Sequence, residues 1–503
     1  MSLLSRLLSD LVRGERTTDP HTPPRAQEAD ETAAAQARAA AHPDSAAHLE
    51  RLAALYRDSG RIDEAIEVYG RVAALRPDLP SAGSALLFHE LYRRHDRAAL
   101  RDQHVAWAQR FAPQTEAPAL DNTPEPDRPL RVGYVSADLR RSSAAPFIEP
   151  LLRHRDRARF AAYCYHTSSR RDGTTKRLRD YADAWRDVDG LNDQDFAARV
   201  LADRVDILLE LNGHTRGNRL TSLARRLAPV QASYLGYGAT TGVSAIDYRI
   251  TDARIDPPPD AERYYVERLA YLPGAMWCFT PPADAPDPGM LPAAASGRVT
   301  FASFNYFAKL SPGALRAWAS ILRRLPESRL LLIGAPRGSA RERVRELFAH
   351  EGVDGERLSF HARADYAGYL ALMRQADIAL DSFPYTGGAT TCDALWMGVP
   401  VLTLAGAGPM ERSGLSLLTA LGMEDWVARS EDDYVERAVR LAGDAPALGA
   451  LRAGLRARVA ASELCDAPRF VQGFEALLAR MWRGWCEGRS MLTGAGFAAG
   501  VSS

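Results

Sequence analysis

Lysine is almost missing from this chain of 503 residues, although lysine and arginine together number 63. The two lysines are Lys176 and Lys309, so arginine supplies nearly every positive charge. Drift toward arginine codons in a GC-rich genome would leave lysine mainly where a compact ammonium works better than a planar guanidinium. Lys309 is therefore a candidate functional residue, because it follows a stretch that reads as a buried strand, "VTFASFN" at 299–305.

Other features that are missing narrow the class of protein. Lys plus Arg equals Asp plus Glu at 63 each, so no excess charge points to nucleic acid or an anionic membrane. No apolar run reaches the ~18 residues that a membrane span needs. The five cysteines form no CxxC pair and no Cys/His cluster, which fits reduced thiols in a cytoplasm and predicts neither disulfides nor a zinc site. We therefore expect a cytoplasmic protein without a metal site or a transmembrane segment.

The N-terminal part reads as helical, in a chain whose length suggests roughly three domains. Residues 1–45 are expected to hold an N-terminal helix followed by a flexible linker rich in Pro, Thr, Ala and Glu. Residues 46–120 are expected to form a tetratricopeptide-like helical region, in which the stretch of about 34 residues that starts at Ala46 fits the helix–turn–helix repeat. The matching positions are Leu49, Leu52, Ala53, Tyr56, Gly60, Ala65, Tyr69 and Pro77. One repeat cannot bury its own face, so we expect it to dock onto the neighbouring domain.

Two runs of alternating strands and helices follow, at 129–279 and 298–465. The first contains "LRVGYVSAD", "FAAYCYHTS", "VDILLELNGHT", "QASYLGYG" and "YRITDARI", and the second contains "VTFASFN", "SRLLLIGA", "RLSFHA", "ADIALDSF" and "PVLTLAG". This alternation is typical of parallel, doubly wound α/β sheets. Two such domains place a ligand cleft between the carboxyl ends of their strands. A last amphipathic helix is expected over 466–487, followed by a disordered tail at 488–503.

Two elements of the second α/β run suit a phosphorylated ligand. Lys309 stands at a strand-to-helix junction, where Ser311 is a credible N-cap and Pro312 takes the first helical position. The second element is "DSFPYTGGATTCDALWMG" at 381–398, which puts two glycines after a strand and two threonines at the start of a helix. Glycines allow close backbone approach, and a helix N-terminus offers free N–H groups, so together these elements suit a diphosphate. Taken alone, a Gly-Gly-x-Thr-Thr turn is more often a plain loop.

At this point the chain resembles a known family. The segments "RVGYVSADLR", "LLELNGHTRG", "FASFNYFAKLSPGALRAWASIL" and "ADIALDSFPYTGGATTCDALWMGVPVLTLAG", with the tetratricopeptide unit, are similar to the O-GlcNAc transferase and SPINDLY-like family, glycosyltransferase family 41. The resemblance covers roughly 46–487. It implies GT-B architecture and inverting, metal-independent transfer of a sugar, most often GlcNAc from UDP-GlcNAc, to Ser or Thr of a protein, without a cofactor. It also implies that the tetratricopeptide region helps to seat the protein acceptor.

The resemblance assigns roles to residues of the second α/β run. Lys309 matches a lysine that contacts the donor diphosphate, and the helix start from Gly388 to Thr391, which includes Thr390, matches the cradle around it. Asp393 matches the aspartate that holds the ribose, and Tyr369 could stack on the base. The remaining expected nucleotide-sugar contacts are Asn305 and Gly387.

The first α/β run departs from the family pattern. Ser142 and Pro146 stand where members usually have histidines, which leaves the general base unassigned. His214 in "NGHTRG" is the best titrating candidate, although it could equally be a loop histidine that is hydrogen-bonded to backbone. Three hypotheses stay open: a Ser/Thr transferase, an enzyme with another donor (UDP-glucose or GDP-fucose) or an Asn acceptor, and a degenerate homologue that binds a nucleotide sugar or a partner without catalysis.

Overall fold

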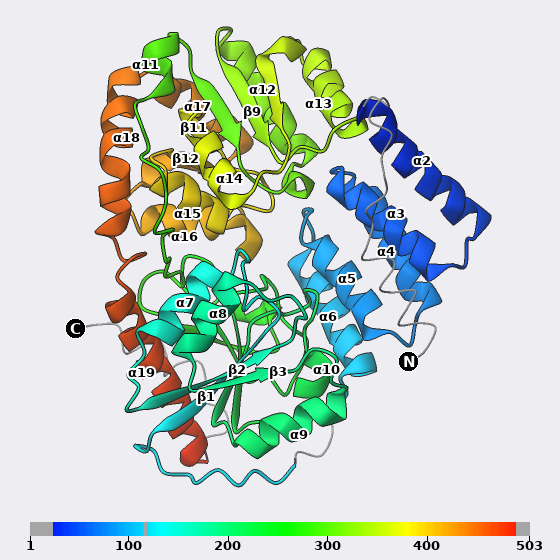
Figure 1. Ribbon diagram of the computed structural model, residues 1–503, viewed down its shortest axis with the longest axis vertical. Coiled ribbons are helices and arrows are strands. Elements are labelled where there is room, and N and C mark those ends of the chain that lie inside the picture. Colours follow the sequence, from blue (N-terminus) through cyan, green and yellow to red (C-terminus); the bar gives the residue numbers. More distant parts are fainter. Residues whose placement is uncertain (1–23, 115–117, 489–503) are drawn as a thin grey trace.

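The computed structural model describes residues 24–114 and 118–488. Two α/β halves lie one above the other, and a helical region runs along one side of both (Figure 1). Most of the helix and linker expected over 1–45, namely residues 1–23, and the tail after 488 lie outside the described residues. Within the described ranges, no helix combines the length and the apolar character that crossing a bilayer requires.

The N-terminal half is built on one sheet of seven strands in the order β3-β2-β1-β4-β5-β6-β7. All its pairings are parallel. Its strands are β1 (Leu130–Ser136), β2 (Phe160–His166), β3 (Ala184–Asp187), β4 (Ile207–Glu210), β5 (Val230–Tyr234), β6 (Tyr248–Thr251) and β7 (Arg268–Tyr271). Its helices are α7 (Ala145–Arg153), α8 (Gly173–Tyr181), α9 (Asp193–Asp203), α10 (Leu220–Leu223) and the 3-10 turn η1 (Glu262–Tyr264).

The C-terminal half repeats this plan with six parallel strands in the order β10-β9-β8-β11-β12-β13. The strands are β8 (Thr300–Ser303), β9 (Arg329–Ile333), β10 (Leu358–His361), β11 (Ile378–Leu380), β12 (Val401–Leu404) and β13 (Val427–Ala428). The helices are α11 (Pro292–Ser296), α12 (Pro312–Arg324), α13 (Ser339–His350), α14 (Tyr366–Met373), α15 (Ala389–Trp396), α16 (Ser413–Thr419), α17 (Glu431–Ala442) and α18 (Ala445–Ala460). Short 3-10 turns are η2 (Phe307–Lys309), η3 (Gly355–Arg357), η4 (Pro409–Glu411) and η5 (Glu424–Trp426).

The C-terminal sheet therefore has the 3-2-1-4-5-6 order of a doubly wound nucleotide-binding fold, and the N-terminal sheet has the same order with a seventh strand added at its edge. The predicted GT-B architecture is confirmed. In such a sheet, the loops after the first and fourth strands meet at the point where the strand order reverses. In the C-terminal half these strands are β8 and β11, which lie side by side. The loop that carries Lys309 follows β8, and the Gly387–Gly388 turn follows β11.

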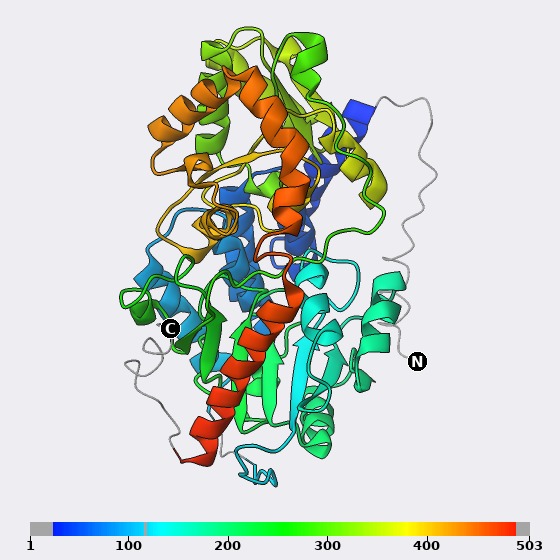
Figure 2. The same cartoon turned by 90° about the vertical axis from the view of Figure 1, so that its left-hand side faces the viewer.

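The last helix ties the two halves together. Helix α19 (Ala467–Cys486) leaves the C-terminal half and lies along the N-terminal sheet, as Figure 2 shows. Its Phe474 ring packs 5.1 Å from Tyr234 of β5, and Trp482 Nε1 donates a hydrogen bond to the carbonyl of Glu125 at 3.0 Å. The predicted amphipathic helix over 466–487 thus packs against the protein's own core.

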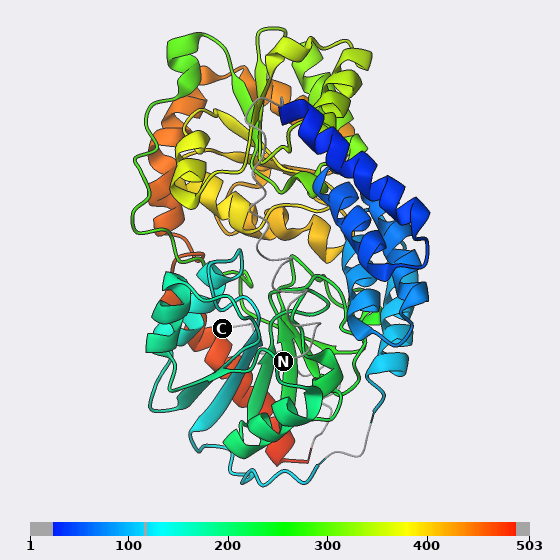
Figure 3. The same ribbon diagram turned by 45° about the vertical axis from the view of Figure 1, so that its right-hand side comes forward.

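The helical region consists of α2 (Pro24–Ala41), α3 (Ala46–Asp58), α4 (Ile62–Leu75), α5 (Pro80–Glu90) and α6 (Arg97–Phe111). Helices α3 and α4 form the predicted pair, and their shared apolar positions are buried in one cluster. The flexible linker expected up to residue 45 is wrong over Pro24–Ala41, because Ala35 and Ala39 bury the face of α2 against α3. Figure 3 shows this region running beside both halves.

Candidate active site

Lys309 is held at the cleft edge of the C-terminal sheet by the turn η2. The side chain of Ser311 accepts a hydrogen bond from Ala314 N at 3.1 Å, so the predicted N-cap of α12 is confirmed. The ammonium of Lys309 donates to the carbonyl of Thr386 at 3.0 Å and lies 4.0 Å from the centre of the Tyr385 ring. Burial lowers the pKa of Lys309 to about 8, while the nearby Asp381 carboxylate opposes that shift. The structure thus places Lys309 directly beside the second predicted element.

The Gly387–Gly388 turn leads straight into α15. A Cβ at Gly387 would lie 2.6 Å from Thr391 Oγ1 and 2.7 Å from Thr390 Oγ1, so no side chain fits there. Gly388 is the N-cap of α15 and caps it with no side chain. The first backbone N–H groups of a helix have no intrahelical partner, so this end of α15 can donate to an anion.

Asp381, at the end of β11, connects the loop that carries Lys309 to the Gly387–Gly388 turn through hydrogen bonds. Its Oδ1 accepts from Asn305 Nδ2 at 2.8 Å and from Gly387 N at 2.7 Å, and its Oδ2 accepts from Thr403 Oγ1 at 2.7 Å. Thr390 Oγ1 in turn donates to Asn305 Oδ1 at 2.8 Å. The sequence analysis missed Asp381, whose signal is an acidic residue directly after the buried strand "ALD". Asn305 therefore holds the shape of the turn, and its predicted contact with the nucleotide sugar stays a prediction.

Helices α15 and α14 bring together Asp393 and a pair of tyrosines. Asp393 is buried, and its carboxylate accepts a hydrogen bond from Tyr366 Oη at 2.8 Å. Burial raises the pKa of Asp393 to about 7. The Tyr366 and Tyr369 rings lie 6.1 Å apart and nearly parallel, and the Tyr369 hydroxyl is buried with no hydrogen-bond partner in the described part of the chain. The structure thus brings together the two residues that the resemblance assigns to ribose and base, and their contacts with a nucleotide stay predictions.

Replacing Asp393 with alanine is expected to weaken binding of nucleoside diphosphates roughly tenfold, because a charged acceptor of ribose hydroxyls is lost. Since the pKa of Asp393 is about 7, the wild-type affinity should rise from pH 6 to pH 8 as the carboxylate ionises. Calorimetric titration with UDP and GDP measures both effects. Asp432→Ala, which changes an exposed aspartate of the same half, is the control. Unchanged affinity in Asp393→Ala would reject the ribose assignment.

His214 does not lie where a general base is needed. It is 1 % exposed and lies beneath α5 and α6, where its ring meets Trp107 edge-on at 4.5 Å. Its Nε2 donates to the carbonyl of Thr241 at 2.9 Å, so its Nδ1 accepts from Ser84 Oγ at 3.0 Å. Burial holds the pKa of His214 well below its usual range. The prediction that His214 titrates during catalysis is therefore wrong, and the alternative of a hydrogen-bonded loop histidine holds.

The packing of α5 and α6 over His214 predicts that the stability of the folded protein falls in acid. His104 also sits there, donating from Nδ1 to the carbonyl of Leu100 at 2.7 Å, and burial lowers its pKa to about 4. Because His104 and His214 have an unfolded pKa near 6.5, the unfolded chain binds more protons, and stability should fall as pH drops from about 6.5 toward 4. Thermal unfolding should show a midpoint that falls less steeply over this range in His104→Gln than in the wild type. His350→Gln, an exposed histidine, should leave the slope unchanged; equal slopes in all three proteins would contradict this account.

The cleft edge of the N-terminal half offers a carboxylate in place of the usual histidines. Ser142 Oγ donates to the backbone carbonyl of Asp138 at 3.0 Å and accepts from Ala145 N at 3.2 Å, so it shapes the start of α7. The carbonyl of Pro146 accepts from Thr280 N at 2.9 Å. Asp138 lies two residues after the end of β1 and is half-buried; burial raises its pKa, and Arg140 lies 3.6 Å from its carboxylate. The sequence analysis missed Asp138, although it ends the quoted "VSAD" strand.

Trp277 packs against both α7 of the N-terminal half and the start of α15 in the C-terminal half. Its ring centroid lies 5.2 Å from that of Phe147 on α7, and its Cζ3 and Cη2 atoms lie 4.0 and 3.9 Å from the Cβ position of Gly388. The start of α7, which follows Asp138 and Ser142, is therefore close to the start of α15. Trp277 thus connects the acceptor-side and donor-side groups across the boundary between the two halves.

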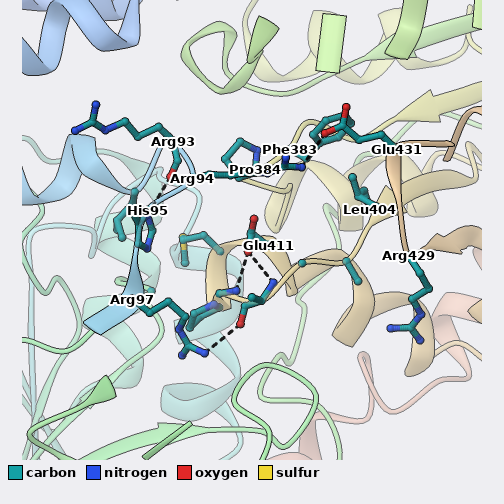
Figure 4. A pocket seen from close by; sticks show the side chains of 18 of the residues that line it. Arg93, Arg94, His95, Arg97, Phe383, Pro384, Leu404, Glu411, Arg429 and Glu431 are labelled. Atoms are coloured by element: carbon teal, nitrogen blue, oxygen red, sulfur yellow. Dashed lines mark hydrogen bonds and ion pairs between the residues drawn. The ribbon is translucent and has the colours of Figure 1, made fainter. Parts of the chain in front are cut away.

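A cavity of about 350 Å³ lies at the junction of the three parts of the molecule, between the α5–α6 connection and the loops that follow β12 and β13. Figure 4 shows Arg94 directed toward Glu431 and Arg97 directed toward the loop that follows β12. The Arg94–Glu431 ion pair measures 2.8 Å, and Arg97 donates to the carbonyl of Ala407 at 3.1 Å. Pro384 lines the cavity from the loop that leads to Thr386. None of the predicted site residues lines this cavity.

The comparisons with known proteins fit this geometry. The model of the family described as "Glycosyl transferase family 41" matches residues 98–279 and 290–474. The chain belongs to glycosyltransferase family 41. It is 39% identical over 424 residues to a probable UDP-N-acetylglucosamine–peptide N-acetylglucosaminyltransferase SPINDLY of Solanum lycopersicum, covering 82% of this chain and 45% of that protein. A protein named SEC in Arabidopsis thaliana, with the same probable activity, is 32% identical over 72% of this chain and 38% of its own length.

Among solved structures, a mutant of Thermobaculum terrenum O-GlcNAc transferase is similar to this family 41 chain with a TM-score of 0.86 and 35% sequence identity. The match covers 91% of this chain and 88% of that one. This chain spans less than half the length of the curated relatives it matches. The family and the fold are therefore shown, whereas the activity, substrates and partners are matters of proposal.

Proposed function

We propose that this chain is an inverting glycosyltransferase that moves a sugar from a nucleotide donor to a protein side chain. One observation supports this most strongly: the Lys309 ammonium is hydrogen-bonded to Thr386, next to Gly387 and the open N-terminus of α15. A point charge and a helix start that converge on one spot suit a diphosphate leaving group. Asp393 would hold the ribose and Tyr369 the base.

GlcNAc from UDP-GlcNAc, transferred to Ser or Thr, is the reaction that we favour. The relatives quoted above carry this donor and a peptide acceptor in their names. UDP-glucose or GDP-fucose as donor and asparagine as acceptor are alternatives, because the contacts proposed for Lys309, α15 and Asp393 are to diphosphate and ribose, which all these donors share. The helical region beside the cleft would help to seat the protein acceptor. Five free cysteines support the proposal of a reducing cytoplasm.

Residues of the two α/β halves would have different roles in the reaction. As the glycosidic bond breaks, negative charge grows on the diphosphate, and the ammonium of Lys309 stabilises it. The acceptor hydroxyl attacks from the opposite face of the sugar and gives up its proton. We assign that proton to Asp138, because its half-buried carboxylate lies near the start of α7 on the proposed acceptor side, and burial raises its pKa.

A donor panel tests the proposal. Purified protein is incubated separately with UDP-GlcNAc, UDP-glucose and GDP-fucose, and release of the nucleoside diphosphate is measured. We expect release from one donor, with Asp138→Asn and Lys309→Met both strongly reduced. Asp180→Asn, an exposed aspartate of the N-terminal half, is the matched control. Binding of a donor without any release, alone or with candidate acceptors, would favour the degenerate homologue.

Turnover is expected to survive EDTA. In the described ranges no group of three or more His, Cys, Asp or Glu side chains has the arrangement to hold a metal ion, and the ammonium of Lys309 would neutralise the diphosphate instead. The measurement compares rates before and after dialysis against EDTA. A rate that falls with EDTA and returns with Mg²⁺ or Mn²⁺ would show that the diphosphate needs a metal.

A further inference from the structure

The turn that carries Lys309 is held from outside by the helical region. The hydroxyl of Tyr306 donates a hydrogen bond to the carboxylate of Asp58, the last residue of α3. Phe307 packs against the turn between α3 and α4: a Cβ on Gly60, whose φ is +78°, would lie 3.1 Å from Phe307 Cε1. The residues just before Lys309 are thus fixed by a segment that lies about 250 residues earlier in the chain.

Further hydrogen bonds fix the position of Asp58 and of the α3–α4 turn that follows it. The Asp58 carboxylate also accepts from Arg57 Nε at 2.7 Å, which orients it toward Tyr306. The carbonyl of Ser59 accepts a hydrogen bond from Arg343 of α13, so the α3–α4 turn is attached to the C-terminal half at a second point. A displacement of the turn would therefore be transmitted to Tyr306 and Phe307.

The backbone of the turn η2 links Tyr306 to Lys309, so the position of Tyr306 affects the position of the ammonium. Lys309 N donates to the carbonyl of Tyr306 at 2.8 Å, which closes the turn η2. On its inner side the same loop is fixed by the hydrogen bond from Asn305 to Asp381. Asp381 therefore holds the loop from within, and Asp58 and Gly60 hold it from the helical region.

We propose that Asp58 and Gly60 are positioning residues for the Lys309 ammonium, so that the helical region supports the chemistry on the donor as well as seating an acceptor. This inference rests on the proposed function. A misplacement of about 1 Å at a reacting centre can cost on the order of 10² in rate. The contacts that Asp58 and Gly60 make with this turn are therefore expected to affect turnover. These contacts would position the ammonium even when no acceptor protein is bound.

The sharpest variant is Tyr306→Phe, which removes one hydroxyl and leaves the ring in place. We expect turnover of the donor, measured without acceptor, to fall about tenfold, with KM raised by no more than about threefold, because the ammonium acts mainly in the transition state. Asp58→Ala should give a similar loss. Asp78→Ala is the matched control, since this carboxylate of the same helical region pairs with Arg76 on the surface.

A double-mutant cycle separates positioning from general stabilisation. If Asp58 and Tyr306 act through Lys309, Tyr306→Phe should cause no further loss in a Lys309→Met background. The same cycle is repeated by calorimetric titration with UDP and GDP, which requires no turnover: Tyr306→Phe should weaken binding about threefold in the wild type and not at all in Lys309→Met. Equal losses in both backgrounds, or no loss in either single variant, would overturn the inference. Failure of the wild type itself to bind UDP or GDP and to release sugar would instead count against the proposed function.

Discussion

Lys309→Met is expected to reduce turnover about 10²-fold or more, with a much smaller loss of donor affinity. Removing one preorganised donor that faces developing charge typically costs on the order of 3 kcal/mol in the transition state. The ammonium is already held 3.0 Å from the carbonyl of Thr386, so little reorganisation is needed as the diphosphate leaves. Steady-state rates with the active donor, together with calorimetric affinity for UDP and GDP, measure the two effects separately. Lys176→Met, which changes the second lysine of the chain, is the control.

Lys309→Arg asks whether charge alone suffices. The ammonium lies 4.0 Å from the centre of the Tyr385 ring in a half-buried site, where a planar guanidinium is larger and has fixed donor directions. We therefore expect arginine to fail almost as badly as methionine. Full activity of Lys309→Arg would show that only the charge matters, and full activity of Lys309→Met would remove the catalytic role of Lys309.

Asp381→Ala is expected to have the second large effect, on both stability and donor binding. The substitution leaves the Asn305 amide, the Gly387 N–H and the Thr403 hydroxyl without their buried acceptor. Each unsatisfied group costs roughly 1–3 kcal/mol, so the midpoint of thermal unfolding should fall by several degrees and the Gly387 turn should lose its shape. Asp432→Ala, an exposed aspartate of the same half, should change neither. A wild-type midpoint in Asp381→Ala would contradict the role assigned to this network.

Asp381 also affects the pH dependence of turnover. Burial lowers the pKa of Lys309 to about 8, and the Asp381 carboxylate counteracts that shift. Turnover should therefore decline as pH rises through about 8 and the ammonium loses its proton. In Asp381→Asn the counteracting charge is gone, so the decline should begin at a lower pH. A decline at the same pH in both proteins would show that another group controls this limb of the profile.

The central strands could be predicted because they are buried on both faces. Strands such as β4 and β9 read as continuous apolar runs, which is the signature of the middle of a parallel sheet. Strands β3, β7 and β13 were missed. β3 lies at a sheet edge and is partly exposed along its length, and β13 has two residues, so neither carries a run of apolar residues.

The donor side of the site could be predicted because its signals are local. Lys309, the two glycines and the two threonines each stand at a strand end or a helix start, which the sequence displays directly. The Asp381 network and the Tyr366–Asp393 hydrogen bond join residues that lie up to 76 and 27 positions apart, respectively, and no local pattern reveals such a pairing. His214 failed as a prediction for the same reason, since its loop position is local but its burial under α5 and α6 is tertiary.

Intact-mass spectrometry of candidate acceptor proteins co-expressed with this protein tests the central claim most directly. The wild type should add the mass of one or more sugar residues to an acceptor, the Lys309→Met variant should leave that acceptor unmodified, and the Lys176→Met control should modify it like the wild type. Fragmentation should then place the sugar on Ser or Thr. Modification to the same extent by wild type and Lys309→Met would contradict the account, because the edge formed by Lys309 and α15 would then not be where the sugar is released.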